Sequence, residues 1–374
     1  MWSVWLTRLI EEEGVTDIVY YGDRQPYHRA ARAVAMERGI KAHAVEFGYL
    51  RPGWLTLERG GMSAFSHFPA DPAVIRQNGS GLAALPKTGG FGHHWLHEAT
   101  HEIIYNITNL LYAPIFRNYA PDLLEKPYKE YLSGVAKLWR GRKQRSRYEA
   151  VERLCLEASW PMALYALQLQ TDWQIRANSP IADQRDSLDH VISSLARSAP
   201  ADMRLLVKLH PLDSGRIDWE AEVAEIARRH GVGDRVLFLD GGNLDALLRR
   251  SHGAIVINST VGLQALRMGF PVKVLGVAVY DLPGLTHQGS LESFWHSPDP
   301  VDTELRVAFV RLLAASTQVP GSFYNRKGRA VAVKKVADRL AMGRVNEPNA
   351  FVTPPPRLAR ARRMGIPVDS ADVM

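Results

Sequence analysis

The pattern of hydrophobic and polar positions contains two regions in which short apolar runs alternate with amphipathic segments. In the first region, the apolar runs at 17–21 and 41–47 predict strands, and the amphipathic segment 26–38 between them predicts a helix. A further helix is predicted at 4–13. This strand–helix–strand order predicts a parallel sheet near the N-terminus.

The second region begins near residue 162, and its alternation is longer and more regular. Each predicted strand is followed by a polar turn and, in most cases, a helix, which is typical of a doubly wound parallel sheet. Ligands bind at the carboxyl ends of the strands in such sheets, so polar residues at those ends are the first candidates for a site. The predicted strands are 162–169, 203–209, 235–239, 253–257 and 271–275, and the predicted helices are 184–195, 217–229, 244–250 and 261–268.

A long helical segment is predicted between the two regions. Residues 94–119 and 126–153 have a helical pattern rich in aromatic residues, whereas the Gly- and Pro-rich segment 69–92 is predicted to be a loop. We assign this insert to the first unit, which gives an N-terminal domain of residues 1–160.

The remaining C-terminal part is divided into a domain and a tail. Helices predicted at 301–314 and 328–342 are expected to close the second unit, which gives a domain of residues 161–345. Three consecutive prolines and few apolar residues follow, so residues 346–374 are predicted to be a mobile Pro/Arg-rich tail.

Composition fits a two-domain α/β protein without disulfides. The chain has 374 residues, enough for two domains. Its single cysteine, Cys155, excludes an internal disulfide framework and a cysteine-rich zinc site. The N-terminus lacks the pattern of a signal peptide, and no uninterrupted apolar stretch of about 18 residues is present. We therefore expect a soluble, cytoplasmic protein in a reducing compartment.

Two short basic clusters account for the formal net charge of +7, because removing them changes it to −2. The body of the protein is not basic, which argues against a nucleic-acid groove. Each cluster is interpreted first as a solvated helix end or loop, and second as a contact for anionic lipid headgroups. The clusters are Arg140, Arg142, Lys143, Arg145 and Arg147, and Arg357, Arg360, Arg362 and Arg363.

Two predicted strand ends carry residues that suit a phosphate. A histidine and a lysine at one end, and a Ser-Thr pair at the start of a helix at the other, would meet at one rim of a parallel sheet. Together they form a candidate clamp for a nucleotide phosphate, although the Ser-Thr pair alone could be an ordinary helix cap. The residues are Lys208, His210 and Pro211 on the first turn and Asn258, Ser259 and Thr260 on the second.

Polar residues at other strand ends are candidates for sugar binding and catalysis. Gln168 and Gln170 suit sugar hydroxyls, and Asp172 suits a base or nucleophile, unless this segment is only a polar interdomain turn. Carboxylates across the expected cleft could activate an acceptor hydroxyl, although Asp23 could instead cap a helix. These N-terminal candidates are Asp23, His28 and Glu46.

The segment from His97 to His101 matches the zinc-protease pattern H-E-x-x-H in a predicted helix. The extended form of the motif is absent, because Ile104 and Ile107 occupy its Gly and His positions. A distant residue such as Glu125 is still an alternative third zinc ligand. We nevertheless interpret the segment as a histidine-rich surface and expect no metal.

Several motifs in chain order resemble the bacterial capsule polysaccharide biosynthesis/export family. The resemblance runs from about residue 17 to 324, and jointly the motifs are far more specific than any one of them. They are Tyr21-Gly22-Asp23-Arg24-Gln25-Pro26-Tyr27-His28, the segment from Glu46 to Glu58, Lys208-Leu209-His210-Pro211, Asn258-Ser259-Thr260-Val261-Gly262-Leu263, the segment from Tyr280 to His287, and Gly321-Ser322-Phe323-Tyr324.

The resemblance implies a retaining glycosyltransferase that moves Kdo (3-deoxy-D-manno-octulosonic acid) from CMP-Kdo to a phosphatidylglycerol-linked acceptor. It implies a GT-B fold, in which two Rossmann-like domains enclose a cleft, with the acceptor on the N-terminal side and the nucleotide sugar on the C-terminal side. By resemblance, His210, Ser259 and Thr260 would hold CMP, Asp172 would be the catalytic aspartate, and Arg51 would bind substrate. No cofactor is implied, and the expected partners are the capsule machinery and, peripherally, the cytoplasmic face of the inner membrane.

The chain departs from this family in two respects. Relatives begin with a further strand and a Gly-rich loop ahead of Trp2, so the N-terminal domain is expected to lack its first strand. The family often has Glu-Glu-Gly where this chain has Glu46-Phe47-Gly48, so the second acid is not essential here. The alternatives are a non-catalytic capsule assembly or export factor, a transferase with another nucleotide-sugar donor, and a zinc hydrolase.

Overall fold

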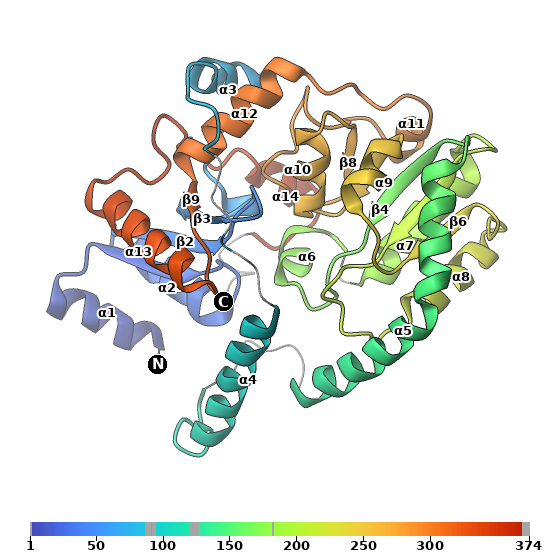
Figure 1. The fold of residues 1–374 in the computed structure, drawn as a ribbon. Coiled ribbons are helices and arrows are strands. Elements are labelled where there is room, and N and C mark those ends of the chain that lie inside the picture. Colours follow the sequence, from blue (N-terminus) through green and yellow to red (C-terminus); the bar gives the residue numbers. More distant parts are fainter. Residues whose placement is uncertain (1, 87–90, 92–94, 120–126, 182, 369–374) are drawn as a thin grey trace.

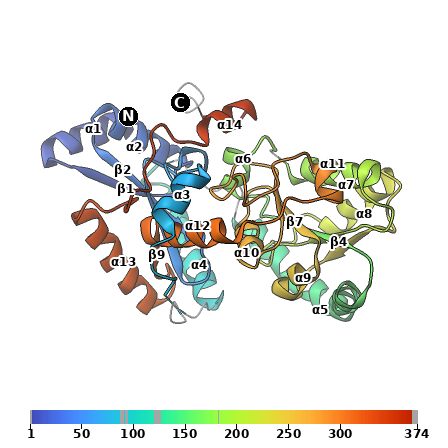
Figure 2. The same cartoon turned by 90° about the horizontal axis from the view of Figure 1, so that it is seen from above.

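The computed structural model describes residues 2–86, 91, 95–119, 127–181 and 183–368, which form two α/β units side by side (Figures 1 and 2). One unit contains a four-stranded sheet and the other a five-stranded sheet. The predicted α/β class with two units is therefore confirmed. Among the described residues, no helix has the length and apolar character needed to cross a membrane.

The first sheet has the strand order β1-β2-β3-β9. β1 (Asp17–Tyr21) and β2 (Lys41–Phe47) are parallel and are joined by helix α2 (Pro26–Glu37), as the alternating pattern predicted. β3 (Trp54–Arg59) runs antiparallel to β2 and is followed across the sheet by β9 (Gln318–Pro320), also antiparallel. The sequence analysis did not identify β3, whose hairpin with β2 carries the segment around Arg51.

Helix α1 (Trp2–Glu13) and helix α2 cover the first sheet through a small apolar core. Leu6 and Ile10 of α1 face Val34 and Ala35 of α2, at the three- and four-residue spacing of an amphipathic helix face. Pro26 occupies the first turn of α2, where a missing N–H costs no hydrogen bond.

The second sheet is entirely parallel and has the order β6-β5-β4-β7-β8. The chain runs outward from the central strand β4 in one direction and then returns to its other side, as in a doubly wound fold. The carboxyl ends of all five strands consequently lie at one edge. The strands are β4 (Met162–Ala166), β5 (Arg204–Lys208), β6 (Val236–Leu239), β7 (Gly253–Val256) and β8 (Val272–Val274).

Helices cover both faces of the second sheet, because successive residues of its strands point to opposite faces. In β4, Ala163 and Tyr165 belong to one core and Met162 and Leu164 to the other. The helices of this unit are α6 (Trp173–Asn178), α7 (Gln184–Ser198), α8 (Trp219–Arg229), α9 (Leu244–Arg250), α10 (Thr260–Arg267) and α11 (Leu291–His296).

Two long helices connect the units, and a shorter one precedes them. Helices α4 (Trp95–Tyr112) and α5 (Pro127–Glu157) confirm the predicted helical insert, and α5 extends along the second unit (Figure 1). The segment predicted to be a loop contains helix α3 (Pro72–Gly79), capped by the Asp71 side chain. α3 packs on helix α12 (Thr303–Ser316), and Gly79 is so close to Ala308 that no side chain fits between them.

The chain returns to the first unit after α11, which corrects the predicted boundary at residue 345. Strand β9 pairs with β3, so α12 and helix α13 (Arg326–Ala341) lie with the first sheet rather than closing the second. The core that contains Phe309 of α12 includes Trp54 and Phe68 of the first unit and Leu263 of the second. Both units therefore share this core.

The predicted mobile tail is wrong for residues 346–368, which are folded and include helix α14 (Leu358–Arg363). Arg357, only 3% exposed, donates to the carbonyls of Phe68 and Pro69 of the first unit and of Ala278 and Val279 of the second. Arg357 is thus a buried bridge between the units and not a solvated cation.

Other members of the basic clusters are paired with carboxylates. Arg360 forms an ion pair with Asp281 (2.6 Å), and Arg145 with Glu149 (2.8 Å). Arg147 also forms an ion pair, with Glu220. These pairs reduce the positive field of both clusters at the surface.

Candidate functional site

The second sheet places the two predicted phosphate-binding turns at the same edge. β5 and β7 flank β4, so the turn after Lys208 and the turn before α10 lie on either side of the segment that follows β4. Strands in a sheet are about 4.8 Å apart, which puts the two turns roughly 10 Å from each other. A nucleotide phosphate and its ribose fit this span.

His210 lies on the first of these turns with its ring fixed by the backbone. The Leu212 N–H donates to His210 Nδ1 (3.1 Å), so the neutral ring carries its proton on Nε2. Burial, with smaller contributions from the charges of Arg51, Lys137 and Lys208, lowers the pKa of His210 to about 4 against the opposing charge of Asp213. At neutral pH His210 is therefore a neutral hydrogen-bond donor within electrostatic reach of three cations and of the Asp213 carboxylate.

Two of these cations come from different elements of the second unit. Lys208, the last residue of β5, is 6% exposed, and burial lowers its pKa against the opposing effect of Asp240. Lys137 of α5 donates to the Asp213 carbonyl (2.9 Å) and lies 3.6 Å from an Asp240 carboxylate oxygen. Asp240 thus interacts with both lysines, and Glu152 also acts on Lys208. An anion beside His210 would be stabilised by the charge of the lysines that these carboxylates leave uncompensated.

The second turn forms the N-terminus of α10. Ser259 caps the helix by accepting the Val261 N–H (3.2 Å), as predicted for a Ser in this position. The Tyr280 hydroxyl donates to the Ser259 carbonyl, and Gly262 is so close to this hydroxyl that a side chain there would displace it. The positive end of the helix dipole therefore faces the rim, and half-buried Thr260 is the first residue of the helix there.

Amide side chains hold the segment between these two turns. Gln168 Nε2 donates to Asn258 Oδ1 (2.8 Å), and the Asn258 N–H donates to Gln168 Oε1 (3.1 Å). Gln184 exchanges hydrogen bonds with the backbone of Gln168, and its own N–H donates to Gln170 Oε1 (3.1 Å). The structure thus places Gln168, Gln170 and Asn258 in a network that positions the site.

A second group of residues near this edge belongs to the first unit and would form the opposite wall of the expected cleft. Arg51 follows the β2 strand, its Nε donates to the Gly48 carbonyl (3.3 Å), and its guanidinium lies over the Phe47 ring. Phe323 packs edge-on against both Phe47 and Tyr21. Since Arg51 also affects the pKa of His210, this wall is within electrostatic reach of the phosphate-binding turns.

Two candidate catalytic carboxylates both affect the pKa of Tyr21. Burial raises the pKa of the Tyr21 hydroxyl, and the charges of Glu46 and Asp172 raise it further, whereas Arg51 lowers it. Glu46 belongs to β2 of the first unit and half-buried Asp172 to the turn after β4 of the second. Both carboxylates therefore lie within electrostatic reach of the Tyr21 hydroxyl, one from each unit.

The other two N-terminal candidates lie differently. Asp23 is 1% exposed, accepts the Met62 N–H at Oδ2 (2.7 Å) and lies beside Arg24, so it has no access to an acceptor hydroxyl. We therefore correct its assignment from acceptor base to a residue that holds the Met62 loop. His28 contacts Gln25 and stacks on the Tyr20 ring on the first turns of α2.

The H-E-x-x-H segment lies in α4, and the side chains of His97 and Glu98 lie outside the described residues. His101 is exposed and lies 3.5 Å from a guanidinium nitrogen of Arg329. Among the side chains that the structure describes, no group of three His, Cys, Asp or Glu residues is arranged to hold a metal ion.

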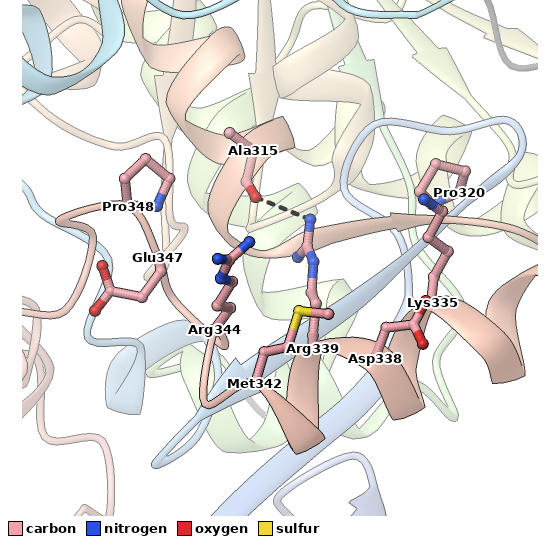
Figure 3. Close-up of a pocket in the computed structure, with 9 residues that line it drawn as sticks. All are labelled: Ala315, Pro320, Lys335, Asp338, Arg339, Met342, Arg344, Glu347 and Pro348. Carbon is pink, nitrogen blue, oxygen red and sulfur yellow. Dashed lines mark hydrogen bonds between the residues drawn. The ribbon is translucent and has the colours of Figure 1, made fainter.

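A cavity of about 680 Å³ lies outside this cleft, between α12, β9, α13 and the segment around Glu347 (Figure 3). Arg339 on its wall donates to the carbonyls of Ala315, Ser316 and Gln318, so its guanidinium serves the fold. None of the predicted site residues lines this cavity.

The sequence analysis missed three residues of the cleft. Lys137 comes from the middle of a long helix, where its spacing has no feature that distinguishes it from the neighbouring basic residues. Tyr324 lies against the Phe47 ring and affects the pKa of Tyr21. Both tyrosines belong to motifs noted in the sequence, and the position of Tyr21 at the carboxyl end of β1 is a signal that could have identified it.

Comparisons with known proteins agree with one another. A family model described as capsule polysaccharide biosynthesis protein matches residues 16–324. Capsule polysaccharide export protein KpsS of Escherichia coli is 32% identical over 321 residues, which cover 86% of this chain and 82% of KpsS. Capsule polysaccharide modification protein LipB of Neisseria meningitidis serogroup B is 33% identical over 343 residues, covering 86% of this chain and 78% of LipB.

A solved structure is also similar. The beta Kdo 2,7 transferase of Thermosulfurimonas dismutans KpsC aligns with 89% of this chain and 88% of its own, at 14% identity and a TM-score of 0.45. The family model covers most of the chain, and the E. coli and Neisseria proteins share about a third of their residues with it over most of its length. The chain belongs to the capsule polysaccharide biosynthesis protein family.

Proposed function

We propose that this capsule biosynthesis protein is a retaining glycosyltransferase that moves Kdo from CMP-Kdo to a phosphatidylglycerol-linked acceptor. The observation that carries the proposal is the arrangement around His210. A neutral histidine donor lies near Lys137 and Lys208 of its own unit and within electrostatic reach of Arg51 of the other unit, and the carboxylates Asp172 and Glu46 both act on the Tyr21 hydroxyl between the units. Anion recognition beside paired carboxylates suits transfer of a sugar from a nucleotide.

The phosphate of the donor would be held between the His210 turn and the N-terminus of α10. His210 Nε2 and the Thr260 hydroxyl are the donors, and the cations stabilise the charge that grows on CMP as it leaves. CMP carries one phosphate, and these groups together supply the positive charge that its departure requires.

Asp172 would attack the anomeric carbon in the first displacement. Its carboxylate oxygen forms a bond to that carbon as the bond to the CMP phosphate oxygen breaks. The acceptor hydroxyl then attacks the same carbon, Asp172 leaves, and Glu46 accepts the hydroxyl proton. Two displacements give net retention of configuration.

Nucleotide specificity gives the first test of this proposal. In thermal unfolding, CMP should raise the melting temperature of the full chain, whereas UDP and GDP should not, because only a ligand that binds the folded state stabilises it. Stabilisation by UDP or GDP instead of CMP would identify a transferase of another donor class. No stabilisation by any of the three would favour a non-catalytic assembly or export factor.

The role of Asp172 is tested by a conservative substitution. Asp172→Asn should abolish Kdo transfer from CMP-Kdo, with a loss on the order of a thousandfold or more, yet preserve the thermal shift with CMP. Asp186→Asn makes the same chemical change on the exposed first turn of α7 and should retain full activity. Unchanged transfer in Asp172→Asn would remove this residue from the mechanism.

A further inference from the structure

Helix α4 exposes an unusual amount of apolar surface. Ile104, Ile107, Leu110 and Leu111 are 52–75% exposed, and the turn after the helix exposes Ile115 and Phe116 to a similar extent. α4 extends from the lower edge of the molecule away from both sheets (Figure 1). Contiguous exposed apolar surface of this kind marks an interaction site rather than ordinary surface.

The distribution of these side chains around α4 indicates what covers them. At about 100° per residue, the exposed apolar positions from Ile103 to Tyr112 span about 220° of the helix circumference. A groove on a protein partner covers one face of a helix, whereas a lipid phase surrounds a projecting helix on several sides. Residues 103–119 contain no Asp or Glu, and their single charge is Arg117.

Aromatic residues extend this surface to the N-terminus. The rings of Trp5 and Trp2 are stacked, Trp2 packs edge-on against Tyr27, and Tyr27 stacks on Tyr119 of the segment after α4. The Tyr119 hydroxyl lies 3.3 Å from that of Tyr105 on α4. Trp and Tyr are enriched where proteins meet the interface between hydrocarbon and headgroups.

Exposed cations surround the base of α4. Arg326, Lys327 and Arg329 are exposed at the start of α13, and Arg329 lies against His101 in the second turn of α4. Apolar residues at the tip and cations at the base correspond to the order of acyl chains and anionic headgroups in a bilayer.

We propose that α4, the turn after it and the stacked tryptophans of α1 dock the protein on a bilayer that contains anionic lipid. The tip residues Leu110, Leu111, Ile115 and Phe116 enter the acyl-chain boundary, and the α13 cations contact the headgroups. Bilayer docking does not depend on which sugar the cleft transfers. It differs from the sequence-based analysis, in which lipid contact was the second interpretation of the α5 cluster and of the cluster in the tail.

Vesicle flotation of the full chain tests this proposal. The protein should bind vesicles of phosphatidylcholine mixed with phosphatidylglycerol and bind vesicles of phosphatidylcholine alone more weakly. The double variant Leu110→Ser with Leu111→Ser should lose at least about tenfold in partitioning to the mixed vesicles. The matched control is Met36→Ser with Val333→Ser, which replaces two similarly exposed apolar residues, each 69% exposed, on α2 and α13 and should bind like the wild type.

Three results would overturn the proposal. They are the absence of binding to mixed vesicles, equal binding to both kinds of vesicle, and equal losses in the two double variants. Size-exclusion chromatography distinguishes the main alternative, because a wild-type dimer that the Leu110/Leu111 variant dissociates, without vesicle binding, would assign α4 to self-association. Nucleotide thermal shifts in both variants report the cleft separately from the docking surface.

Discussion

The protonation state of His210 is the property of the cleft that a bound phosphate would change most. In the ligand-free protein its pKa is about 4, because the ring is largely buried and surrounded by Arg51, Lys137 and Lys208. An anion placed against Nε2 opposes all of these effects. Binding of a phosphodiester should therefore be accompanied by uptake of a proton by His210, at Nδ1, which gives up the hydrogen bond that it accepts from the Leu212 N–H.

The magnitude follows from two free energies. Lowering the pKa from 6.5 to about 4 disfavours protonation by about 3 kcal/mol, at about 1.4 kcal/mol for each tenfold change. One negative charge about 4 Å from the ring contributes about 4 kcal/mol in favour of protonation at an effective dielectric constant of about 20. Loss of the hydrogen bond from the Leu212 N–H to Nδ1 costs about 1 kcal/mol of the second energy. The remainder nearly offsets the first energy, so the bound state should take up roughly half of one proton at about pH 6 and almost none at about pH 8.5.

Isothermal titration calorimetry measures this uptake directly. The methyl ester of CMP is a suitable ligand, because its phosphodiester, like that of a CMP-sugar, does not titrate near neutral pH. Titrations at one pH in two buffers with different ionisation enthalpies give the number of protons bound with the ligand. The affinity should also rise as the pH falls from about 8 to about 6.

Two variants make the measurement specific. His210→Asn keeps a polar side chain but should show no proton uptake, whereas His190→Asn, a control on exposed α7 surface, should behave like the wild type. Proton uptake near zero in the wild type at pH 6, or the same uptake in His210→Asn, would refute the proposed contact between His210 and the phosphate.

Three further predictions concern the opposite wall and the buried charges. Arg51→Met should weaken CMP binding by about tenfold or more, because a charge-assisted hydrogen bond to phosphate is lost, and an unchanged thermal shift would contradict this role. Burial raises the pKa of Glu58 from 4.5 to about 7, so the wild type should lose stability as the pH rises through this range. In urea unfolding, the Glu58→Gln variant should lose less stability than the wild type over the same rise in pH. Parallel pH profiles of the two proteins would disprove the assignment of this pH dependence to Glu58. Arg357→Met removes the donor shared by four carbonyls of the two units. The free energy of unfolding in urea should fall by about 3 kcal/mol or more. A loss below about 1 kcal/mol would show that water replaces the arginine.

Local pattern was sufficient to predict most elements of the fold but not the crossing of the chain between units. The strands from β4 to β8 were predicted because each is a short apolar run next to an amphipathic helix. β9 is three residues long and pairs with β3, which lies more than 250 residues earlier, so no local signal indicates its partner. The folded state of the tail was not predicted, because the residue that anchors it, Arg357, is charged. Its hydrogen bonds go to carbonyls from both units, and the local sequence does not indicate them.

The candidate site was predictable where it depends on strand ends and not where it depends on other elements. His210, Ser259 and Asp172 each follow a strand of a parallel sheet, and topology alone brings such positions to one edge. Lys137 reaches the same place from α5, and Asp23, which also follows a strand, is covered by the loop of Met62. Packing of later elements over a strand end decides which of its residues stay accessible.

The position of Asp172 depends on contacts from both units. α6 begins directly after Asp172 and ends at Asn178, which is fully buried. Asn178 Oδ1 accepts from Arg24 Nη2 of the first unit (2.7 Å), and its carbonyl accepts the Val277 N–H of the second (2.8 Å). A shift of one unit relative to the other would therefore move α6 and, through it, the turn that carries Asp172. The shared core around Phe309 and the Arg357 bridge oppose such a shift, so they maintain the distance between Asp172 and the wall that carries Glu46.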